Sequence, residues 1–553
     1  MSTEQHKILK VHPADNVLVA LTPLEAGAKV SYEGEDYTIQ EIVKAKHKFA
    51  TQDLAVGDSI YMYGVLVGKA QLPIKKGGLI STGNVKHAAN DFNVGDRKTE
   101  WAQPDTSAFK NRTFNGYHRA DGSVGTANYW VVIPMVFCEN RNLDVLQQAL
   151  VTDLGYGRNR SYQKQSHQLV ELYKNGKTVE EILATDLQAD YANNSNARLF
   201  PNVDGIKFLN HDGGCGGTRQ DAQALCGLLA GYITHPNVAG ATVLSLGCQN
   251  AQVSMLEEEI KKRTPEFSKP LYILEQQKIG TESAFLSEAI KQTFAGLILA
   301  NQQTRQPAPL SKICIGLECG GSDGFSGISA NPAIGYTSDL LIAMGGSVIL
   351  SEFPELCGVE QNLSDRCMTT EAAERFSHLM RTYNDRAKAV GSGFDMNPSP
   401  GNIRDGLITD AIKSAGAAKK GGTSPVTDVL DYPEKVSKPG LNLLCTPGND
   451  VESTTAEVAS GANIVLFTTG LGTPTGNPVS PVVKIASNTA LFDRMRDIID
   501  INTGTIIEGK ETIPQAGARI LDYVIGVASG EIQVAAVRHV QDDFIPWKRG
   551  VSL

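Results

Sequence analysis

The stretch ICIGLECGGSDGFSGISANPAIGYTSD, residues 313–339, decides the fold. It opens with an apolar run over 313–317 that suits a buried strand, and Glu318, Cys319 and two glycines then interrupt the run. A buried strand that ends in a glycine-rich polar loop is typical of open α/β sheets, in which ligands bind where the strands end. The loop that follows this strand is therefore a candidate binding site.

Apolar strands alternate with helical patterns on both sides of this stretch. The other predicted strands cover 128–138, 241–248, 271–275, 347–353, 441–447 and 463–469. The predicted helices lie near 143–154, from about 252, and across 282–301. This alternation implies crossover connections and parallel sheets that are covered on their faces, so the fold class is α/β.

Polar segments divide the chain into domains. The first 87 residues are short β-branched runs separated by turn signals, and they predict a small all-β module. Residues 88–111 are polar and unperiodic, and a second break lies around 302–312. We predict the β module at 1–87, a linker at 88–111, and α/β domains with mainly parallel sheets at 112–302 and 303–553.

The composition excludes several classes of function. The chain has 51 basic and 60 acidic residues, a formal charge of −9, which argues against a protein that coats nucleic acid. No run of 18 apolar residues and no secretory pattern is present, so we expect no membrane contact. Nine cysteines without the spacing of a disulfide scaffold favour the reducing cytoplasm. Enzymes of this size commonly form symmetric homo-oligomers, and we expect one here.

Cysteines stand at three predicted strand ends, among glycines and polar groups. They are Cys215, Cys248 and Cys319, and His211 precedes the first of them. Glycines let backbone N–H groups approach a ligand and helix N-termini attract anions, so a carboxylate substrate suits these loops. The alternative is that the glycines form tight turns and the cysteines fill small buried spaces. A further loop around Thr473 pairs glycine with hydroxyls but contains no intact dinucleotide motif.

Acidic side chains follow the predicted strand at 347–353. They are Glu352, Glu355 and Glu360. A carboxylate at a strand end can bind a divalent metal or act as acid or base, and neighbouring carboxylates raise each other's proton affinity. A solvated acidic loop is the alternative.

The β module contributes basic candidates. His12, His47 and Lys48 stand beside its apolar segments. A basic pair such as His47 and Lys48 can orient the carboxylate and hydroxyls of a sugar acid. A structural role is the alternative, because a lone histidine is more often structural than catalytic.

Several long motifs resemble the altronate/galactarate dehydratase family. They are the run at 316–335, LSEFPELCGVE at 350–360, FNGYHRADGSVGTANY at 114–129 and NPSPGN at 397–402. HPADNVLVAL, HKFATQDLAVGD and YGVLVGKA resemble the family's N-terminal SAF-type β module, so the resemblance covers nearly the whole chain. It implies dehydration of a hexonic or hexaric acid, altronate first and galactarate second, to a 2-keto-3-deoxy acid. It also implies a divalent metal, iron(II) or manganese(II), and a place in cytoplasmic sugar-acid catabolism.

This chemistry assigns roles to the candidates. Removing the proton next to a carboxylate creates an enediolate, so the site needs a base, a positive charge or metal, and an acid for the leaving hydroxide. We expect His47 or His12 as base or acid and Lys48 at the substrate carboxylate. We expect the metal ligands to be a subset of His211, Cys215, Cys248, Cys319 and Glu352. We expect the substrate contacts to come from Arg219, Ser322, Asp323, Asn331 and Thr473.

One segment departs from the family. Residues 81–84 read STGN where family members carry a histidine-rich, HTHN-like segment, and His87 lies downstream. Either His87 replaces the missing imidazoles, or the geometry of metal and substrate differs. Two other functions stay open. One is an iron–sulfur dehydratase that uses Cys215, Cys248 and Cys319, and the other is a sugar-acid binding or regulatory protein without turnover.

Overall fold

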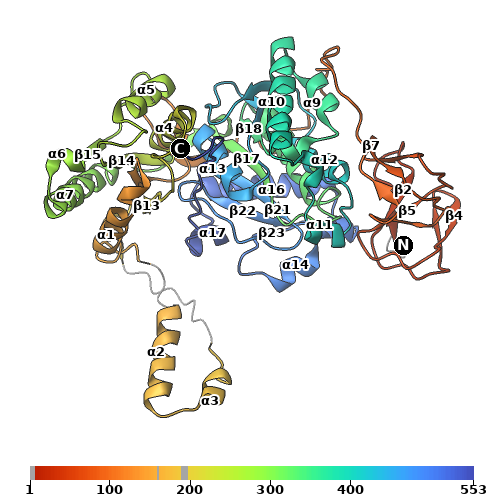
Figure 1. Ribbon diagram of the computed structural model, residues 1–553, viewed down its shortest axis with the longest axis horizontal. Coiled ribbons are helices and arrows are strands. Elements are labelled where there is room, and N and C mark those ends of the chain that lie inside the picture. The colour runs from red at the N-terminus through yellow and green to blue at the C-terminus, as the bar shows by residue number, and fades with distance from the viewer. Residues whose placement is uncertain (1–6, 158–160, 188–196) are drawn as a thin grey trace.

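The computed structural model describes residues 7–157, 161–187 and 197–553. Antiparallel strands form the N-terminal part, and parallel sheets with helices form the two domains that follow (Figure 1). The predicted fold class, an all-β module followed by two α/β domains, is confirmed.

The β module consists of short antiparallel strands. β1 (Ile8–Leu9), β2 (Val17–Ala20), β5 (Lys48–Ala50) and β8 (Leu79–Ile80) form one sheet in that order. A hairpin joins β3 (Lys29–Tyr32) to β4 (Glu35–Thr38), and a third sheet contains β6 (Ser59–Met62), β7 (Val65–Ala70) and β9 (Val85–Lys86). Leu18 and Phe49 are register partners on β2 and β5 and are fully buried, so they lie in the core of the module.

Residues 88–106, here called the strap, contain neither helix nor strand. They are nevertheless fastened to α9 (Glu360–Arg366) by side chains and backbone. The backbone N–H of Asn93 donates to the Gln361 side chain at 3.0 Å, and Lys98 pairs with Asp365 at 2.7 Å. In Figure 1 this part of the chain runs from the β module past α9 and α10 (Thr370–Ala389). The strap thus ties the module to the C-terminal domain.

The second domain contains a parallel sheet in the order β13-β12-β14-β15. The strands are β12 (Tyr129–Pro134), β13 (Gly205–Phe208), β14 (Val238–Ser245) and β15 (Leu271–Glu275). α1 (Asn140–Leu150) and α7 (Glu282–Ala300) pack with Trp130 and Val132, while α4 (Arg219–Thr234) and α5 (Val253–Arg263) pack with Val131 and Ile133. Successive residues of β12 thus face opposite layers of helices, as alternation along a strand requires.

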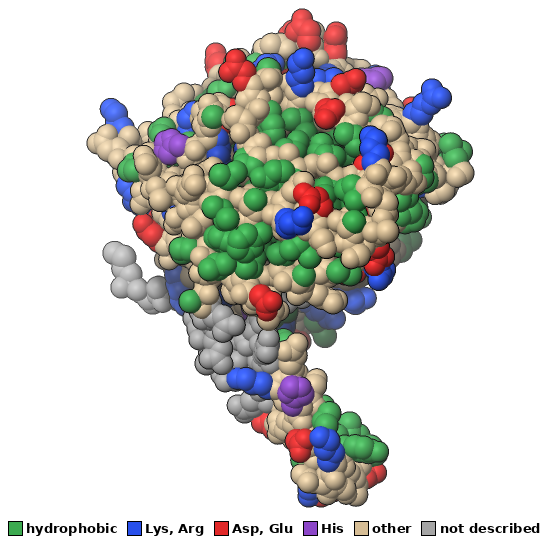
Figure 2. Space-filling model, turned by 90° about the vertical axis from the view of Figure 1, so that its left-hand side faces the viewer, with side chains coloured by type: hydrophobic (Ala, Val, Ile, Leu, Met, Phe, Trp, Pro, Cys, Tyr) green, Lys and Arg blue, Asp and Glu red, His purple; other side chains and the backbone are tan. Residues whose placement is uncertain are grey.

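A pair of helices, α2 (Ser161–Lys174) and α3 (Val179–Leu183), stands away from the second domain (Figure 1). Figure 2 looks at that side of the molecule, and hydrophobic side chains gather there above the helix pair, with few charges among them. α7 lies on this side and exposes Phe294, Ile298 and Leu299. Among the helices of the described residues, none is long and apolar enough to cross a membrane.

The C-terminal domain contains a sheet in the order β19-β20-β18-β17-β21-β22-β23, in which every pairing is parallel. The strands are β17 (Cys314–Cys319), β18 (Ser347–Leu350), β19 (Val426–Leu430), β20 (Gly440–Leu444), β21 (Ile464–Thr469), β22 (Val482–Ala486) and β23 (Ile501–Asn502). α8 (Ala330–Ala343) packs on α16 (Ile513–Ala528), and α13 (Asp450–Ser460) packs between this sheet and α4 of the second domain. The strand β17, predicted from the opening stretch, lies in the middle of the sheet.

A small antiparallel sheet joins the two ends of the second domain. β10 (Thr113–His118) precedes that domain and β16 (Gln306–Pro309) follows it, and the two strands pair directly. β11 (Val124–Gly125) pairs with the other edge of β10. The second domain therefore leaves and rejoins the rest of the chain at one place.

Candidate active site

Lys46 joins the β module to the C-terminal domain. Its Nζ lies 3.0 Å from Asp323 Oδ2 and 3.0 Å from Asp405 Oδ1. Burial alone would lower the pKa of Lys46, but the two carboxylates raise it above its ordinary value. The backbones also approach closely, because a Cβ on Gly324 or Gly406 would lie 2.6 or 2.5 Å from the carbonyl oxygen of Lys46. Only glycine fits at these two positions.

Two of the three predicted catalytic residues of the module, His47 and Lys48, lie at this contact, and His12 does not. Lys48 Nζ and His47 Nε2 each bond a backbone carbonyl of the 404–406 loop, at 2.7 and 3.1 Å. Burial lowers the pKa of Lys48 to about 7. His12 is exposed, and its Nδ1 accepts from the Ala14 N–H inside a turn of the module. The basic pair thus lies between the domains, and His12 lies apart from it.

Titratable groups, most of them buried, meet at the carboxyl ends of β17 and β18. They are Glu318, Cys319, Glu352, Glu355, Lys413 and Lys420, and we call them the carboxylate–lysine cluster. The carboxyl ends of parallel strands lie at the same edge of a sheet, which brings together residues far apart in the chain. Cys319 and Glu352, both predicted metal ligands, are members of this cluster.

Lys420 lies at the centre of the cluster. This residue belongs to η5 (Ala418–Gly421), and its Nζ lies 2.7 Å from Glu352 Oε2 and 2.9 Å from Cys319 Sγ. The thiol of Cys319 in turn lies 3.4 Å from Glu355 Oε2. Burial first, and then the Glu352 carboxylate, raise the pKa of this thiol well above its ordinary value, so it stays protonated and donates.

A second lysine neutralises Glu355. Lys413 belongs to α12 (Asp410–Ala417), and its Nζ donates to Glu355 Oε1 at 2.6 Å and to Asn397 Oδ1 at 2.9 Å. Burial would raise the pKa of Glu355, but Lys413 and Lys420 reverse the effect and hold it below its ordinary value. Two ammonium groups therefore balance the two carboxylates of Glu352 and Glu355.

The pKa values of three neighbouring carboxyl groups are raised instead. Burial, followed by Glu352, raises the pKa of Glu318 well above its ordinary value. Burial also raises the pKa of Glu457 to about 8 and that of Asp450, with help from Glu352 and Glu355, to about 7. An acid with a raised pKa, Glu318, thus lies beside Glu352, which forms a salt bridge with Lys420, and neighbouring carboxyl groups in such different environments are suited to acid–base work.

The backbone at Glu352 is strained. Its φ of 61° and ψ of 56° are left-handed values, which side chains with a Cβ rarely adopt. Its backbone N–H donates to Thr446 Oγ1 at 2.8 Å, which helps to hold this conformation. The Glu352 side chain is directed into the cluster, where Oε1 has no hydrogen-bond partner. Strain of this kind is concentrated at functional sites.

The predicted substrate contacts are divided between two places. Ser322 and Asp323 follow β17, Asn331 lies in the first turn of α8, and Thr473 lies in the loop after β21. The Asp323 Oδ1 atom already accepts from neighbouring backbone and serine groups at 2.8–3.2 Å. Asn331 likewise bonds a backbone carbonyl and a threonine hydroxyl. Arg219 is exposed at the start of α4, in the second domain.

The other predicted metal ligands also lie in the second domain. His211 is buried, its Nε2 lies 2.7 Å from the Pro134 carbonyl oxygen, and its Nδ1 accepts from a backbone N–H. Cys215 and Cys248 are exposed. The structure therefore does not gather the five predicted ligands: Cys319 and Glu352 meet in the carboxylate–lysine cluster, while the other three lie in the second domain. The three cysteines of the iron–sulfur hypothesis are divided between the two domains in the same way.

Ligand atoms of possible metal-binding groups approach within 4.8 Å of one another at three places in the described residues. Two of these groups, Cys319 with Glu352 and Glu355, and Glu318 with Glu352 and Asp450, share the Glu352 carboxylate. Lys420 already holds Glu352 Oε2, and the lysines supply the positive charge that a metal would bring. These two groups therefore fit a cation poorly.

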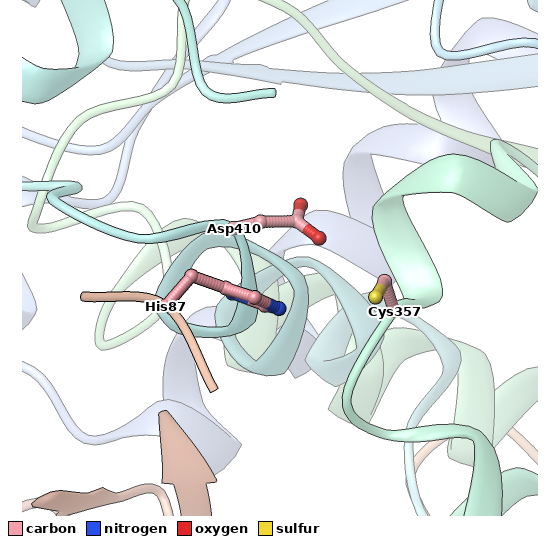
Figure 3. A group of neighbouring side chains, drawn as sticks. All are labelled: His87, Cys357 and Asp410. Carbon is pink, nitrogen blue, oxygen red and sulfur yellow. The ribbon is translucent and has the colours of Figure 1, made fainter. Parts of the chain in front are cut away.

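The third group fits a metal better. It consists of His87 at the end of the β module, Cys357 after η3 (Phe353–Leu356), and Asp410 at the start of α12. Figure 3 shows the three side chains directed toward a common point. Asp410 is only 1% exposed, yet its Oδ2 has no hydrogen-bond partner among the described residues beyond the adjacent Cys357 thiol. A nitrogen, a sulfur and an oxygen ligand are a set that divalent transition metals accept.

Several members of this arrangement were not predicted. Lys413 and Lys420 were missed because a lysine in a small-residue segment such as KSAGAAKKGG, residues 413–422, looks like a solvated one. The only available signal was that three lysines stand in a run of alanine and glycine that is otherwise suited to burial. Lys46, in the basic run at 44–48 of the β module, was missed as well. Asp450, the first residue of α13, was not among the predicted site residues.

Comparisons with known proteins agree with this architecture. Three family models match in chain order: the altronate/galactarate dehydratase SAF domain at 6–88, the second domain of D-galactarate dehydratase/altronate hydrolase at 116–301, and the D-galactarate/altronate dehydratase C-terminal domain at 310–552. Together they cover nearly the whole chain.

Curated relatives match over their full length. The chain is 33% identical to altronate dehydratase of Bacillus subtilis and 33% identical to that of Escherichia coli, over 99% of each chain. It is 31% identical to galactarate dehydratase (L-threo-forming) of Escherichia coli, over 95% of this chain and 93% of the relative. These matches define the chain as a carbon–oxygen hydro-lyase, the predicted class of enzyme. The chain belongs to the altronate/galactarate dehydratase family.

Proposed function

We propose that this enzyme removes water from a sugar acid, altronate first and galactarate second, and forms a 2-keto-3-deoxy acid. The names of its relatives support the substrate class. The observation that carries the proposal is that Glu318, whose pKa is raised well above its ordinary value, lies beside Glu352, which forms a salt bridge with Lys420 at 2.7 Å. This pairing supplies an acid, a base and a positive charge at one edge of the sheet.

The cluster can perform each proton transfer. Glu352 takes the proton from the carbon next to the substrate carboxylate, and the electron pair of that C–H bond becomes the new C=C bond. The hydroxyl on the following carbon leaves as water with the proton of Glu318. The enol product then gains a proton on carbon from solvent and loses its O–H proton to solvent, which gives the keto acid, while the proton on Glu352 passes back to Glu318 and restores both groups. Lys420 stabilises the negative charge that develops on the substrate.

Access to the cluster requires movement of the loops that cover it. A Cβ on Gly448 would lie 3.4 Å from Glu355 Cγ and 3.8 Å from Asn397 Nδ2. The 397–402 segment and the loop before α13 therefore enclose Glu355. Closure of such loops over bound substrate would exclude water from the reaction.

A divalent metal, iron(II) or manganese(II), is part of the proposal. When bound, it would supply positive charge to substrate oxygens. The donor set and the incompletely satisfied Asp410 oxygen of the His87 group support this part. We further propose a cytoplasmic location, supported by nine cysteines that form no disulfide, and self-association, supported by the exposed apolar side chains of α7.

The test is a substrate screen on the full-length enzyme. Protein treated with chelator is assayed for keto acid with altronate, galactarate and other aldonic and aldaric acids, with and without iron(II) or manganese(II). We expect product from at least one acid and recovery of activity with metal. Undiminished turnover in the stripped enzyme would contradict the metal requirement. Absence of product from every acid under both metals would contradict the dehydration itself.

A further inference from the structure

The group formed by His87, Cys357 and Asp410 brings together three distant parts of the chain. His87 follows β9, Cys357 follows η3, and Asp410 begins α12. One ligand atom from each lies within 4.8 Å of the others, and the side chains converge in Figure 3. Atoms bound to one tetrahedral metal lie roughly 3.5 Å apart, so small side-chain adjustments suffice to bind an ion.

The Asp410 carboxylate is buried with an incompletely satisfied oxygen atom. Buried carboxylate oxygens are normally hydrogen-bonded, and those that are not require an explanation. Asp410 is 1% exposed, its Oδ1 accepts a long 3.4 Å bond from Ser414 Oγ, and its Oδ2 has no hydrogen-bond partner among the described residues beyond the adjacent Cys357 thiol. Lys413, one turn further along α12, forms its ion pair with Glu355. A bound cation would satisfy this oxygen.

The donor types select the kind of metal. Magnesium and calcium prefer oxygen ligands alone, whereas an imidazole, a thiolate and a carboxylate suit zinc, iron(II) or cobalt(II). Three protein ligands also leave at least one position open on the ion, which is the arrangement of catalytic rather than structural sites. The group therefore favours a transition metal that can bind one further molecule.

The position of the group connects it to the acid–base residues. Asp410 and Lys413 lie one turn apart on α12, and Lys413 donates to Glu355 in the carboxylate–lysine cluster. Glu355 and Cys357 lie two positions apart in the same loop. A cavity of about 270 Å³ reaches Cys357, and Glu360, Arg381 and Lys388 are among its lining residues. An ion bound by Cys357 would therefore lie beside a cavity with charged lining residues.

We propose that His87, Cys357 and Asp410 bind one divalent transition metal ion, and that this is the ion used in the dehydration. The second half of this statement rests on the proposed function. Cys357 binds as the thiolate and its proton passes to solvent. His87 thus supplies the imidazole that the altered 81–84 segment lacks.

Cobalt(II) tests the site without any assay of activity. Full-length protein is stripped with chelator and titrated anaerobically with cobalt(II), and absorption and bound metal are measured. We expect one equivalent of cobalt and a thiolate-to-cobalt charge-transfer band. Cys357→Ser should abolish the band and weaken binding about 10- to 100-fold. His87→Ala and Asp410→Asn should keep a sulfur band at high cobalt but weaken binding by a similar factor.

Matched cysteine variants make the test specific. Cys248→Ser removes an exposed cysteine of the second domain and should change neither the band nor the stoichiometry. Circular dichroism confirms that each variant is folded. The proposal is overturned if Cys357→Ser retains the band, if Cys319→Ser removes it instead, or if the wild-type protein binds no cobalt.

The site and the reaction can fail separately. If cobalt binds as described and no sugar acid is dehydrated, the proposed function is wrong and the metal site stands. If keto acid forms at the wild-type rate in Cys357→Ser while cobalt binding is lost, the reaction stands and its metal does not bind at this site.

Discussion

Lys420 Nζ lies 2.7 Å from Glu352 Oε2, and both side chains are 1% exposed. An ion pair withdrawn from water in this way does not stabilise a protein by much, because desolvation offsets the attraction between the charges. Breaking the pair is costly, however, since one charge is left buried and alone. A pair of this kind beside a strained backbone is better explained by chemistry than by stability.

Replacing Lys420 should separate these two effects. Lys420→Met should lower kcat by about 10³-fold or more, because it removes the positive charge beside the developing anion. It should also destabilise the protein by about 3–5 kcal/mol. The double variant Lys420→Met/Glu352→Gln should recover much of the stability, measured by denaturant unfolding, but no activity.

Lys484→Met is the control for this prediction. Lys484 is also fully buried in the C-terminal sheet, on β22, but lies outside the carboxylate–lysine cluster. This variant should keep its kcat. Equal losses of kcat in both variants would mean that buried lysines act here only through stability.

Glu318 should act as an acid. Glu318→Gln should lower kcat by about 10²- to 10⁴-fold with little change in stability, because a neutral amide replaces a neutral carboxyl group. Since burial and Glu352 raise its pKa, wild-type kcat should fall as the pH rises through that value. The pH profile of kcat measures this limb. Glu139→Gln, at a fully buried glutamate of the second domain, should leave the profile unchanged.

Asp450 should make stability depend on pH. Its pKa is raised from 3.8 to about 7, so between these values the folded state holds a proton that the unfolded state has lost. Stability therefore falls as the pH rises through this window, by at most about 1.4 kcal/mol for each unit. Asp450→Asn should remove part of this fall, measured as Tm at pH 5 and pH 8. Asp153→Asn, at an exposed aspartate, should behave as the wild type.

Lys48 should behave as a buried structural base. Its pKa is lowered from 10.5 to about 7, so the folded state loses a proton that the unfolded state keeps between these values. Lys48→Met should therefore be stabilising below pH 7, and its advantage should shrink as the pH rises, by at most about 1.4 kcal/mol per unit. Unfolding at pH 6 and pH 9 measures this change. A loss of kcat as large as that of Lys420→Met would instead assign Lys48 to catalysis.

Lys46 should control how firmly the β module is held. Lys46→Ala removes both ion pairs to the C-terminal domain, one of them to the fully buried Asp323. Cleavage within the strap by a protease should become about tenfold faster, which corresponds to about 1.4 kcal/mol. Lys75→Ala breaks an exposed pair within the module and should not change the rate. Equal rates in the wild type and Lys46→Ala would contradict this role.

The sequence predicted where the buried strands end, but it predicted only some of the side chains that meet there. Cys319 and Glu352 were found because apolar runs mark the strands and parallel strands end at one edge. Lys413 and Lys420 were missed because they reach that edge from helical segments whose burial depends on tertiary packing. In the β module, the predicted pair His47 and Lys48 stood one residue from Lys46, the side chain that forms the ion pairs.

The strap illustrates a second limit of the sequence. Residues 88–111 have few apolar residues, which predicts a linker, and no helix or strand forms over 88–106. The side chains and backbone of the strap nevertheless find partners on α9, such as Asp365 for Lys98. Such pairings depend on the position of α9 relative to the strap. The local sequence of the strap does not predict that position.

The pairing of β10 with β16 has a consequence for the order in which the protein assembles during synthesis. β10 leaves the ribosome before the second domain and β16 after it, so their sheet can form only when that domain is complete. The hydrogen bond of His87 can form only later still, because its partner, the Ala411 N–H, lies 324 positions further along the chain. Until then the β module must remain folded through its own small hydrophobic core. A nascent fragment that ends before α12 therefore contains the module but neither the metal-binding group nor a reactive cluster.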